Sequence, residues 1–220
     1  MLGRVQPEWF KFNIMINSHY ESILSNRIIL DLQGYAYKAD YQPIEQEYMG
    51  EIYQSVSVHS LPTAHPLSEH IVKSFLSFNK HYFKYDLCGS FEIQFLKYVP
   101  GGHYNWHCDY GITWADSSTQ KAQLYLEKVM ERYKSKVPLM DEISDGKKDR
   151  KLSMSIQLSC AWDYTGGDLL IRDWHNRKQY ISKEIGNVVV FDSRVPHKVE
   201  PIVDGERYAI VAWAHGPELR

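Results

Sequence analysis

The chain has 220 residues, of which 44% are hydrophobic and 14% aromatic, which suffices for a domain core and excludes a disordered or low-complexity protein. The formal net charge is −2, so overall charge does not favour binding to nucleic acid or an anionic membrane. Cys88, Cys108 and Cys160 fit neither a disulfide scaffold nor a paired-cysteine zinc site. No stretch is apolar enough for a secretory signal or a membrane span. We therefore expect a soluble, cytoplasmic protein in a reducing compartment.

Two helices are expected in the first 90 residues. Ser18 and Glu21 form a capping-box pattern, which predicts a helix that continues through Leu32. Pro66 begins a second segment, in which apolar side chains recur at three- and four-residue steps as far as Tyr82. These elements would support a larger β domain.

The apolar period changes to two from Phe91 onward, with joints that contain glycine or proline. Many short strands at regular spacing are typical of a sandwich or barrel. We predict one domain over 1–220 of α+β, mainly β, class: a β jelly-roll core at 91–215 packed on helical or mixed support at 1–90. The expected strands are Phe91–Tyr98, Tyr104–Tyr110, Leu152–Ser159, Asp168–Arg172, Lys178–Ile181, Val188–Phe191, Lys198–Val203 and Arg207–Ala214.

Residues 113–150 interrupt this strand pattern. Ser117 and Gln120 resemble a capping box and precede an apolar stripe that ends at Tyr133, which predicts a helical insertion. A long insertion of this kind is typical of a lid or of a partner surface, and equally of a decoration packed outside the sheet. The sequence leaves these alternatives open.

His107, Asp109 and His197 form the pattern that points to chemistry. His107 and Asp109 are two residues apart in a strand-like stretch, so their side chains should share one face. By the same rule Trp106, Cys108 and Tyr110 should point away from it. His197 begins a late strand and would supply a third ligand. Two histidines and one carboxylate leave three positions of an octahedral ion open, as in non-haem Fe(II) oxygenases.

Arg207 follows His197 by ten residues and begins the last expected strand. A guanidinium inside a β fold needs an anionic partner, because an unpaired buried cation is costly. A dicarboxylic acid that binds the metal at one end would present its second carboxylate at about that distance. A His-X-Asp pair alone is a weak signal, but its combination with His197 and Arg207 is specific.

Several segments around these residues match one known family. They are Gln94-Phe-Leu-Lys-Tyr-Val-Pro-Gly-Gly-His-Tyr-Asn-Trp-His-Cys-Asp109, Lys151-Leu-Ser-Met-Ser-Ile-Gln-Leu-Ser159, Tyr164-Thr-Gly-Gly-Asp-Leu169, Gly186-Asn-Val-Val-Val-Phe-Asp-Ser193, Pro196-His-Lys-Val199 and Gly205-Glu-Arg-Tyr-Ala-Ile210. In these segments the chain resembles the 2-oxoglutarate- and Fe(II)-dependent dioxygenases, specifically the prolyl 4-hydroxylase-like branch. The resemblance implies a double-stranded β-helix.

The resemblance also implies roles for individual residues. His107, Asp109 and His197 would be the catalytic iron ligands, and Arg207 would pair with the distal carboxylate of 2-oxoglutarate. Three further positions match cosubstrate-pocket residues of relatives. They are Tyr98, where a tyrosine often bonds the cosubstrate; Gln157, where relatives often have a tyrosine that assists the arginine; and Trp213, an aromatic near the metal.

The expected activity is hydroxylation of a C–H bond, with a proline in a protein or peptide as the leading substrate and succinate and CO₂ as further products. The implied cofactors are Fe(II), 2-oxoglutarate and O₂, with ascorbate as a further candidate. One alternative is an oxygenase of the same fold that acts on a small molecule or nucleobase. Another, from a different class, is a non-catalytic jelly-roll binding module. We expect neither nucleic acid nor membrane as a partner.

Overall fold

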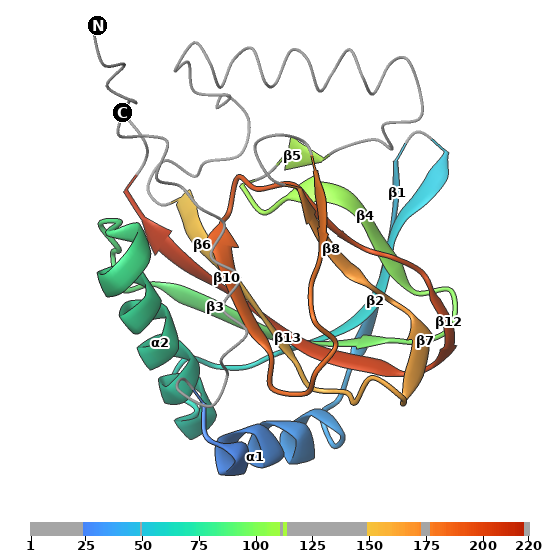
Figure 1. Cartoon of the computed structure of the whole chain (residues 1–220), viewed down its shortest axis with the longest axis horizontal. Helices are drawn as coiled ribbons and strands as arrows, with labels where there is room; N and C mark the ends of the chain where they lie inside the picture. Colours follow the sequence, from blue (N-terminus) through green and yellow to red (C-terminus); the bar gives the residue numbers. More distant parts are fainter. Residues whose placement is uncertain (1–23, 49, 111, 114–148, 173–176, 218–220) are drawn as a thin grey trace, which may run out of the picture.

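The computed structural model describes residues 24–48, 50–110, 112–113, 149–172 and 177–217 (Figure 1). Within these ranges the chain is mainly β-structure with two α-helices and one π-helical turn. None of the helices described is both long and apolar enough to cross a bilayer. The elements are α1 (Asn26–Ala36), β1 (Gln42–Tyr48), β2 (Glu51–Ser60), α2 (Pro66–Phe78), η3 (Asn79–Phe83), β3 (Phe91–Tyr98), β4 (His103–Cys108), β5 (Ile112–Thr113), β6 (Asp149–Gln157), β7 (Tyr164–Gly166), β8 (Leu169–Arg172), β9 (Lys178–Tyr180), β10 (Val188–Asp192), β11 (His197–Val199), β12 (Ile202–Gly205) and β13 (Arg207–Gly216).

Most strands belong to one antiparallel sheet that curls around a central interior (Figure 1). The strand order is β10-β6-β13-β3-β2-β4-β11-β8-β9, with β1 added beside β2 and β5 beside β4. Strands β7 and β12 form a separate two-stranded sheet. In Figure 1, β4 and β8 lie across the interior from β6 and β10, and β11 is hydrogen-bonded between β4 and β8. The predicted mainly β architecture with N-terminal helices is therefore confirmed.

Period-two alternation divides the core into two apolar clusters. Even-numbered residues of β6 and β13, such as Met154 and Ile210, point outward to a cluster shared with α1 and α2. Figure 1 shows both helices along the outer face of β3, β6 and β13. Odd-numbered residues of the same strands point into the curled sheet, where a second cluster contains Tyr98 and Phe191. Parity thus sends Gln157 and Arg207 to the interior side.

The start of α1 differs from the expectation. The helix begins at Asn26, where the Ser25 side chain accepts a hydrogen bond from the Ile28 amide, so Leu24 lies before the helix and packs in the core. The expected capping residue Ser18 lies outside the described residues. The second helix was correctly placed, since Pro66 occupies its first turn.

Three strand expectations also need correction. The hairpin of β1 and β2 precedes Phe91, the first residue expected in a strand, and β2 joins the main sheet beside β3 and β4. The strand expected over Lys198–Val203 is divided into β11 and β12, because Pro201 cannot donate to a ladder. The strand expected as far as Tyr110 ends at Cys108. The predicted helical insertion lies almost wholly outside the described residues.

Candidate metal centre and adjoining pocket

Three side chains converge at the open end of the β4–β11 pair. His107 of β4 and His197, the first residue of β11, lie directly opposite each other in the ladder. Asp109 lies one residue beyond β4, in a turn, so a turn and not strand alternation brings it to the histidines. Its two carboxylate oxygens lie 3.7 Å from His107 Nε2 and 3.5 Å from His197 Nε2. The three candidate ligand atoms all lie within 4.8 Å of one another.

Backbone carbonyls determine which imidazole nitrogen is available. His107 Nδ1 lies 2.8 Å from the Asn105 carbonyl and His197 Nδ1 lies 3.0 Å from the Val195 carbonyl. A carbonyl oxygen only accepts, so each Nδ1 carries the proton and donates. Each Nε2 therefore has a free lone pair directed at Asp109, which is the orientation that a metal-bound histidine requires.

The charge states in this cluster also suit a cation. Burial, together with the neighbouring His197, lowers the pKa of His107 to about 3, so its imidazole is neutral at physiological pH. Burial alone would raise the pKa of Asp109, but the two imidazoles, with Ser153 and Trp213, outweigh it and hold that pKa below its usual value. The buried Asp109 carboxylate, with the two imidazole Nε2 atoms beside it, places a negative charge where a metal cation would be favoured.

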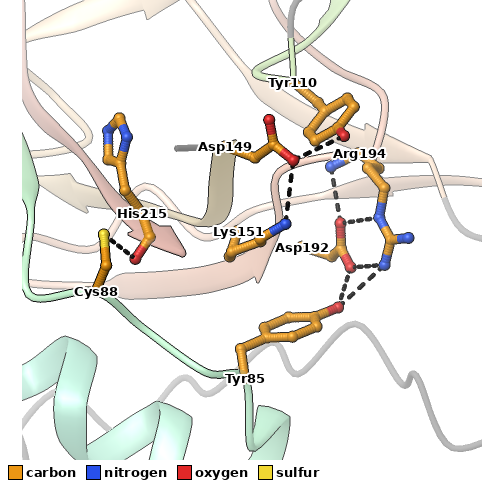
Figure 2. A network of polar contacts seen from close by, with 8 residues as sticks. All are labelled: Tyr85, Cys88, Tyr110, Asp149, Lys151, Asp192, Arg194 and His215. Atoms are coloured by element: carbon orange, nitrogen blue, oxygen red, sulfur yellow. Dashed lines mark hydrogen bonds and ion pairs between the residues drawn. The ribbon is translucent and has the colours of Figure 1, made fainter. Parts of the chain in front are cut away.

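Polar contacts hold the two turns that carry these side chains. The Cys108 thiol donates to the Arg194 carbonyl at 3.1 Å, and the Tyr110 amide donates to the Ser193 carbonyl at 3.1 Å. These bonds connect the Asp109 turn to the turn before His197. Figure 2 shows side-chain hydrogen bonds at both turns. On one side, Asp192 accepts hydrogen bonds from Arg194 and from the Tyr85 hydroxyl. On the other side Asp149 accepts from Tyr110 at 3.0 Å and from the buried Lys151 at 3.2 Å.

Strand alternation in β4 accounts for the directions of Trp106 and Cys108 but not for that of Tyr104. Cys108 and Trp106 are buried away from the metal cluster as expected, and the Arg172 guanidinium lies over the Trp106 ring. Tyr104, however, stacks on the His107 ring with centroids 3.5 Å apart. The register shifts here, since Val199 pairs with Tyr104 while His197 pairs with His107, so β4 contains a bulge. The bulge turns Tyr104 to the metal side.

Arg207 and Tyr98 form the next layer of the site. They are paired directly across β13 and β3 and are both fully buried. The Arg207 side chain makes no hydrogen bond or ion pair with any described residue, and its buried Nε has no partner. Burial, with Asp109 nearby, raises the pKa of Tyr98 to about 12, so its hydroxyl keeps its proton and can donate. A buried guanidinium without an anionic partner is unfavourable, so this position favours binding of an anion, such as the second carboxylate of a metal-bound dicarboxylic acid.

A pocket adjoins Arg207, lined also by Ser155, Gln157, Tyr164 and Lys183. Gln157 also faces into this pocket. Trp213 lies on the same inner face of β13, and its side chain is buried. Sequence reasoning did not select Tyr104, Tyr164 or Lys183, although Tyr164 stands in a matching motif, Tyr-Thr-Gly-Gly.

The geometry and charge of these residues fit Fe(II) and 2-oxoglutarate, the cofactors implied by the sequence resemblance. Two ligand atoms that each lie about 2.1 Å from one ion are at most about 4.2 Å apart, and both Asp109–histidine separations meet this limit. Two histidines and a carboxylate on one side of an ion leave room for a chelating cosubstrate. The unpaired Arg207 charge then matches the far end of a dicarboxylate.

Several solved structures with the same fold are prolyl hydroxylases. A prolyl-4-hydroxylase from Pseudomonas putida superposes with a TM-score of 0.62 over 89% of this chain and 90% of that chain, at 18% identity. A prolyl hydroxylase from Trichoplax adhaerens, solved with a hypoxia inducible factor peptide fragment, gives 0.54 over 92% and 80%, at 18% identity. At these identities the similarity establishes the fold, which is the double-stranded β-helix expected from the sequence.

Curated relatives match a shorter part of the chain. A PKHD-type hydroxylase of Prochlorococcus marinus (strain MIT 9515) is 32% identical over 71 residues, and one of Shewanella sp. (strain MR-7) is 37% identical over 70 residues. Each match covers 32% of this chain and 31% of the relative.

The model of one protein family, described as the 2OG-Fe(II) oxygenase superfamily, matches residues 93–215. This range covers more than half of the chain, including all three residues of the metal cluster and Arg207. The chain therefore belongs to the 2OG-Fe(II) oxygenase superfamily, whose members use Fe(II), 2-oxoglutarate and O₂.

Proposed function

We propose that this protein is an Fe(II)- and 2-oxoglutarate-dependent hydroxylase of the prolyl 4-hydroxylase type, acting on a proline in a protein or peptide. The observation that carries the proposal is the pairing of the His107–Asp109–His197 cluster with an uncompensated Arg207 behind it. The same-fold prolyl hydroxylases, one of them solved with a peptide, support a peptide substrate. Ascorbate is proposed as an auxiliary reductant. Three cysteines without a disulfide, all in the described chain, agree with a cytoplasmic location.

In this proposal His107, Asp109 and His197 hold the iron, and Arg207, with Tyr98, Gln157 and Trp213 nearby, holds 2-oxoglutarate. Bound Fe(II) would supply oxidative decarboxylation of 2-oxoglutarate to succinate and CO₂ with O₂, coupled to substrate hydroxylation.

The chain's own residues contribute orientation and charge. The Asn105 and Val195 carbonyls fix the protonated nitrogen of each histidine, so both Nε2 lone pairs are ready before a metal ion arrives. Arg207 neutralises one end of the cosubstrate in a dry environment, where such a pair is strong. Tyr98 keeps its proton and can donate beside it. Tyr104 covers the His107 ring, which limits access of water to that ligand.

The test is succinate formation from 2-oxoglutarate with Fe(II), O₂ and proline-containing peptides. We expect His107→Ala and Asp109→Ala to lose both metal binding and succinate formation. The matched control is His103→Ala, which removes a histidine of the same strand that lies outside the cluster. Variants that turn over as well as the parent would contradict the metal assignment. Turnover stimulated by small metabolites and by no peptide would contradict the substrate class.

Arg207 is tested separately from the metal. Replacing it with methionine, which keeps much of the buried volume, should raise the 2-oxoglutarate requirement by about two orders of magnitude, because losing one partner of a buried charge pair costs about 2–5 kcal/mol. Metal content should stay close to that of the parent. A parallel loss of metal would show that Arg207 is structural.

A further inference from the structure

The Gln157 side chain cannot itself donate to an anion in the pocket. Its Nε2 donates to the Ser159 carbonyl at 3.0 Å and to the Tyr164 hydroxyl at 3.0 Å. The Ser159 carbonyl only accepts, so the nitrogen must lie on this side of the amide, and both of its N–H groups are used. Only Oε1 remains, and a carbonyl oxygen repels a carboxylate. Direct recognition of the cosubstrate by Gln157 is therefore unfavourable.

Tyr164 has the donor that Gln157 lacks. Its hydroxyl accepts the bond from Gln157, and no described residue accepts its own proton. The side chain is buried and lines the same pocket as Arg207. A Cβ built on Gly167 would lie 3.1 Å from Tyr164 Cε2 and 3.3 Å from Arg207 Cδ, so the two side chains flank one point. The Tyr164 ring and the aliphatic part of the Arg207 side chain therefore lie close together, and both residues line the pocket.

Lys183, the second cation that lines the pocket, already has an anionic partner in Asp168. Its amine lies 3.1 Å from Asp168 Oδ1 and donates to the Gly166 carbonyl at 2.6 Å. The same amine lies 5.0 Å from the centre of the Tyr164 ring. Lys183 therefore holds the tyrosine ring in place, and Arg207 remains the uncompensated charge.

We propose that the Tyr164 hydroxyl, positioned by Gln157, donates to the distal carboxylate of the cosubstrate beside Arg207. The assignment rests on the proposed function and replaces a direct contact from Gln157 with an indirect one. Tyr164 reaches the pocket from β7 in the small sheet, whereas position 157 belongs to β6 of the main sheet. The pocket then presents a charge-assisted pair of donors to one carboxylate, which selects a dicarboxylic 2-oxo acid over a monocarboxylic one.

The experiment is anaerobic calorimetric titration of the Fe(II)-loaded protein with 2-oxoglutarate and with 2-oxopentanoate, which has the same carbon count but no distal carboxylate. Tyr164→Phe should raise the Kd for 2-oxoglutarate about ten- to hundred-fold, as expected for losing one hydrogen bond to a charged group. The Kd for 2-oxopentanoate should stay within about twofold of the parent's value. Tyr180→Phe, which removes a hydroxyl from an exposed tyrosine of β9, should change neither.

Gln157→Met tests the positioning role. We expect it to weaken 2-oxoglutarate binding in the parent and to have no further effect in the Tyr164→Phe background, because it acts through the tyrosine. An equal effect in both backgrounds would overturn the indirect role. Unchanged 2-oxoglutarate binding by Tyr164→Phe, or equal loss for both ligands, would overturn the assignment while the parent still binds 2-oxoglutarate. A parent that binds no 2-oxoglutarate would overturn the proposed function itself.

Discussion

Gly167 lies in a tight backbone turn that lines the pocket beside Arg207, and Gly167→Ala measures how closely this turn is packed. The residue has φ +62°, and an added Cβ would meet Ile202 Cδ1 at 2.2 Å as well as Tyr164 and Arg207. The left-handed conformation costs a residue with a Cβ about 1–2 kcal/mol. Overpacking a buried site adds about 1–3 kcal/mol. We expect the variant to lose about 2–5 kcal/mol of unfolding free energy in urea and to bind 2-oxoglutarate more weakly.

Gly50→Ala is the matched control for this experiment. Gly50 has φ +85°, but a Cβ there would have no atom within 4 Å, so only the conformational cost of about 1–2 kcal/mol applies. The difference between the two variants isolates the packing contribution. If both variants lose the same free energy to within about 0.5 kcal/mol, the close packing of Gly167 against Ile202 and the pocket is refuted.

Three further substitutions test local features of the fold. Gly34→Ala, at an exposed position of α1 where a Cβ meets nothing, should raise the unfolding free energy by about 0.5–1 kcal/mol; a loss would show that the glycine has another role. Ser25→Ala should cost about 1 kcal/mol in the same assay through loss of the α1 N-cap, and an unchanged midpoint would contradict the cap. His215, 3.0 Å from Glu92, together with Arg150 lowers the pKa of that carboxyl to about 2. Because the pKa of Glu92 is lowered in the folded state, its ionised carboxylate stabilises the fold at pH values above the ordinary glutamate pKa. This stabilisation is lost as the pH falls toward 2. Glu92→Gln should therefore lower the free energy of unfolding by up to about 1 kcal/mol at pH 7 and leave it unchanged near pH 2. An equal cost at both pH values would refute that ionic origin.

Local sequence patterns predicted those elements whose signal lies within a few residues. Pro66 with its periodic apolar side chains marked α2, and alternation marked most strands from Phe91 onward. The pattern failed for β1 and β2, in which polar and charged residues interrupt the alternation; these strands are held by pairing with each other and with β3. It also placed the start of the first helix too early, because several residues near that end could have served as caps. The single-domain organisation over 1–220 stays a prediction.

The site residues show a second limit of prediction from local sequence, which concerns the direction of side chains. Strand parity directed Gln157, Arg207 and Trp213 to the interior, because each stands in a regular strand whose outer face packs on the helices. Residue spacing could not predict the direction of Tyr104, since a bulge in β4 turns its side chain toward His107 and a bulge leaves no mark in residue spacing. Asp109 likewise reaches the histidines from a turn.

The sequence by itself determined the residue types of the candidate site and their order along the chain. The spacing of His107 and Asp109, and of His197 and Arg207 ten residues later, can be read directly from the sequence. Only the tertiary structure decided that β11 lies beside β4, so that His197 faces His107, and that Arg207 has no acidic partner among the described residues. It alone showed that both N–H groups of Gln157 are used, one of them by Tyr164. Strand register and hydrogen-bond direction depend on contacts between segments far apart in sequence, and residue spacing does not contain that information.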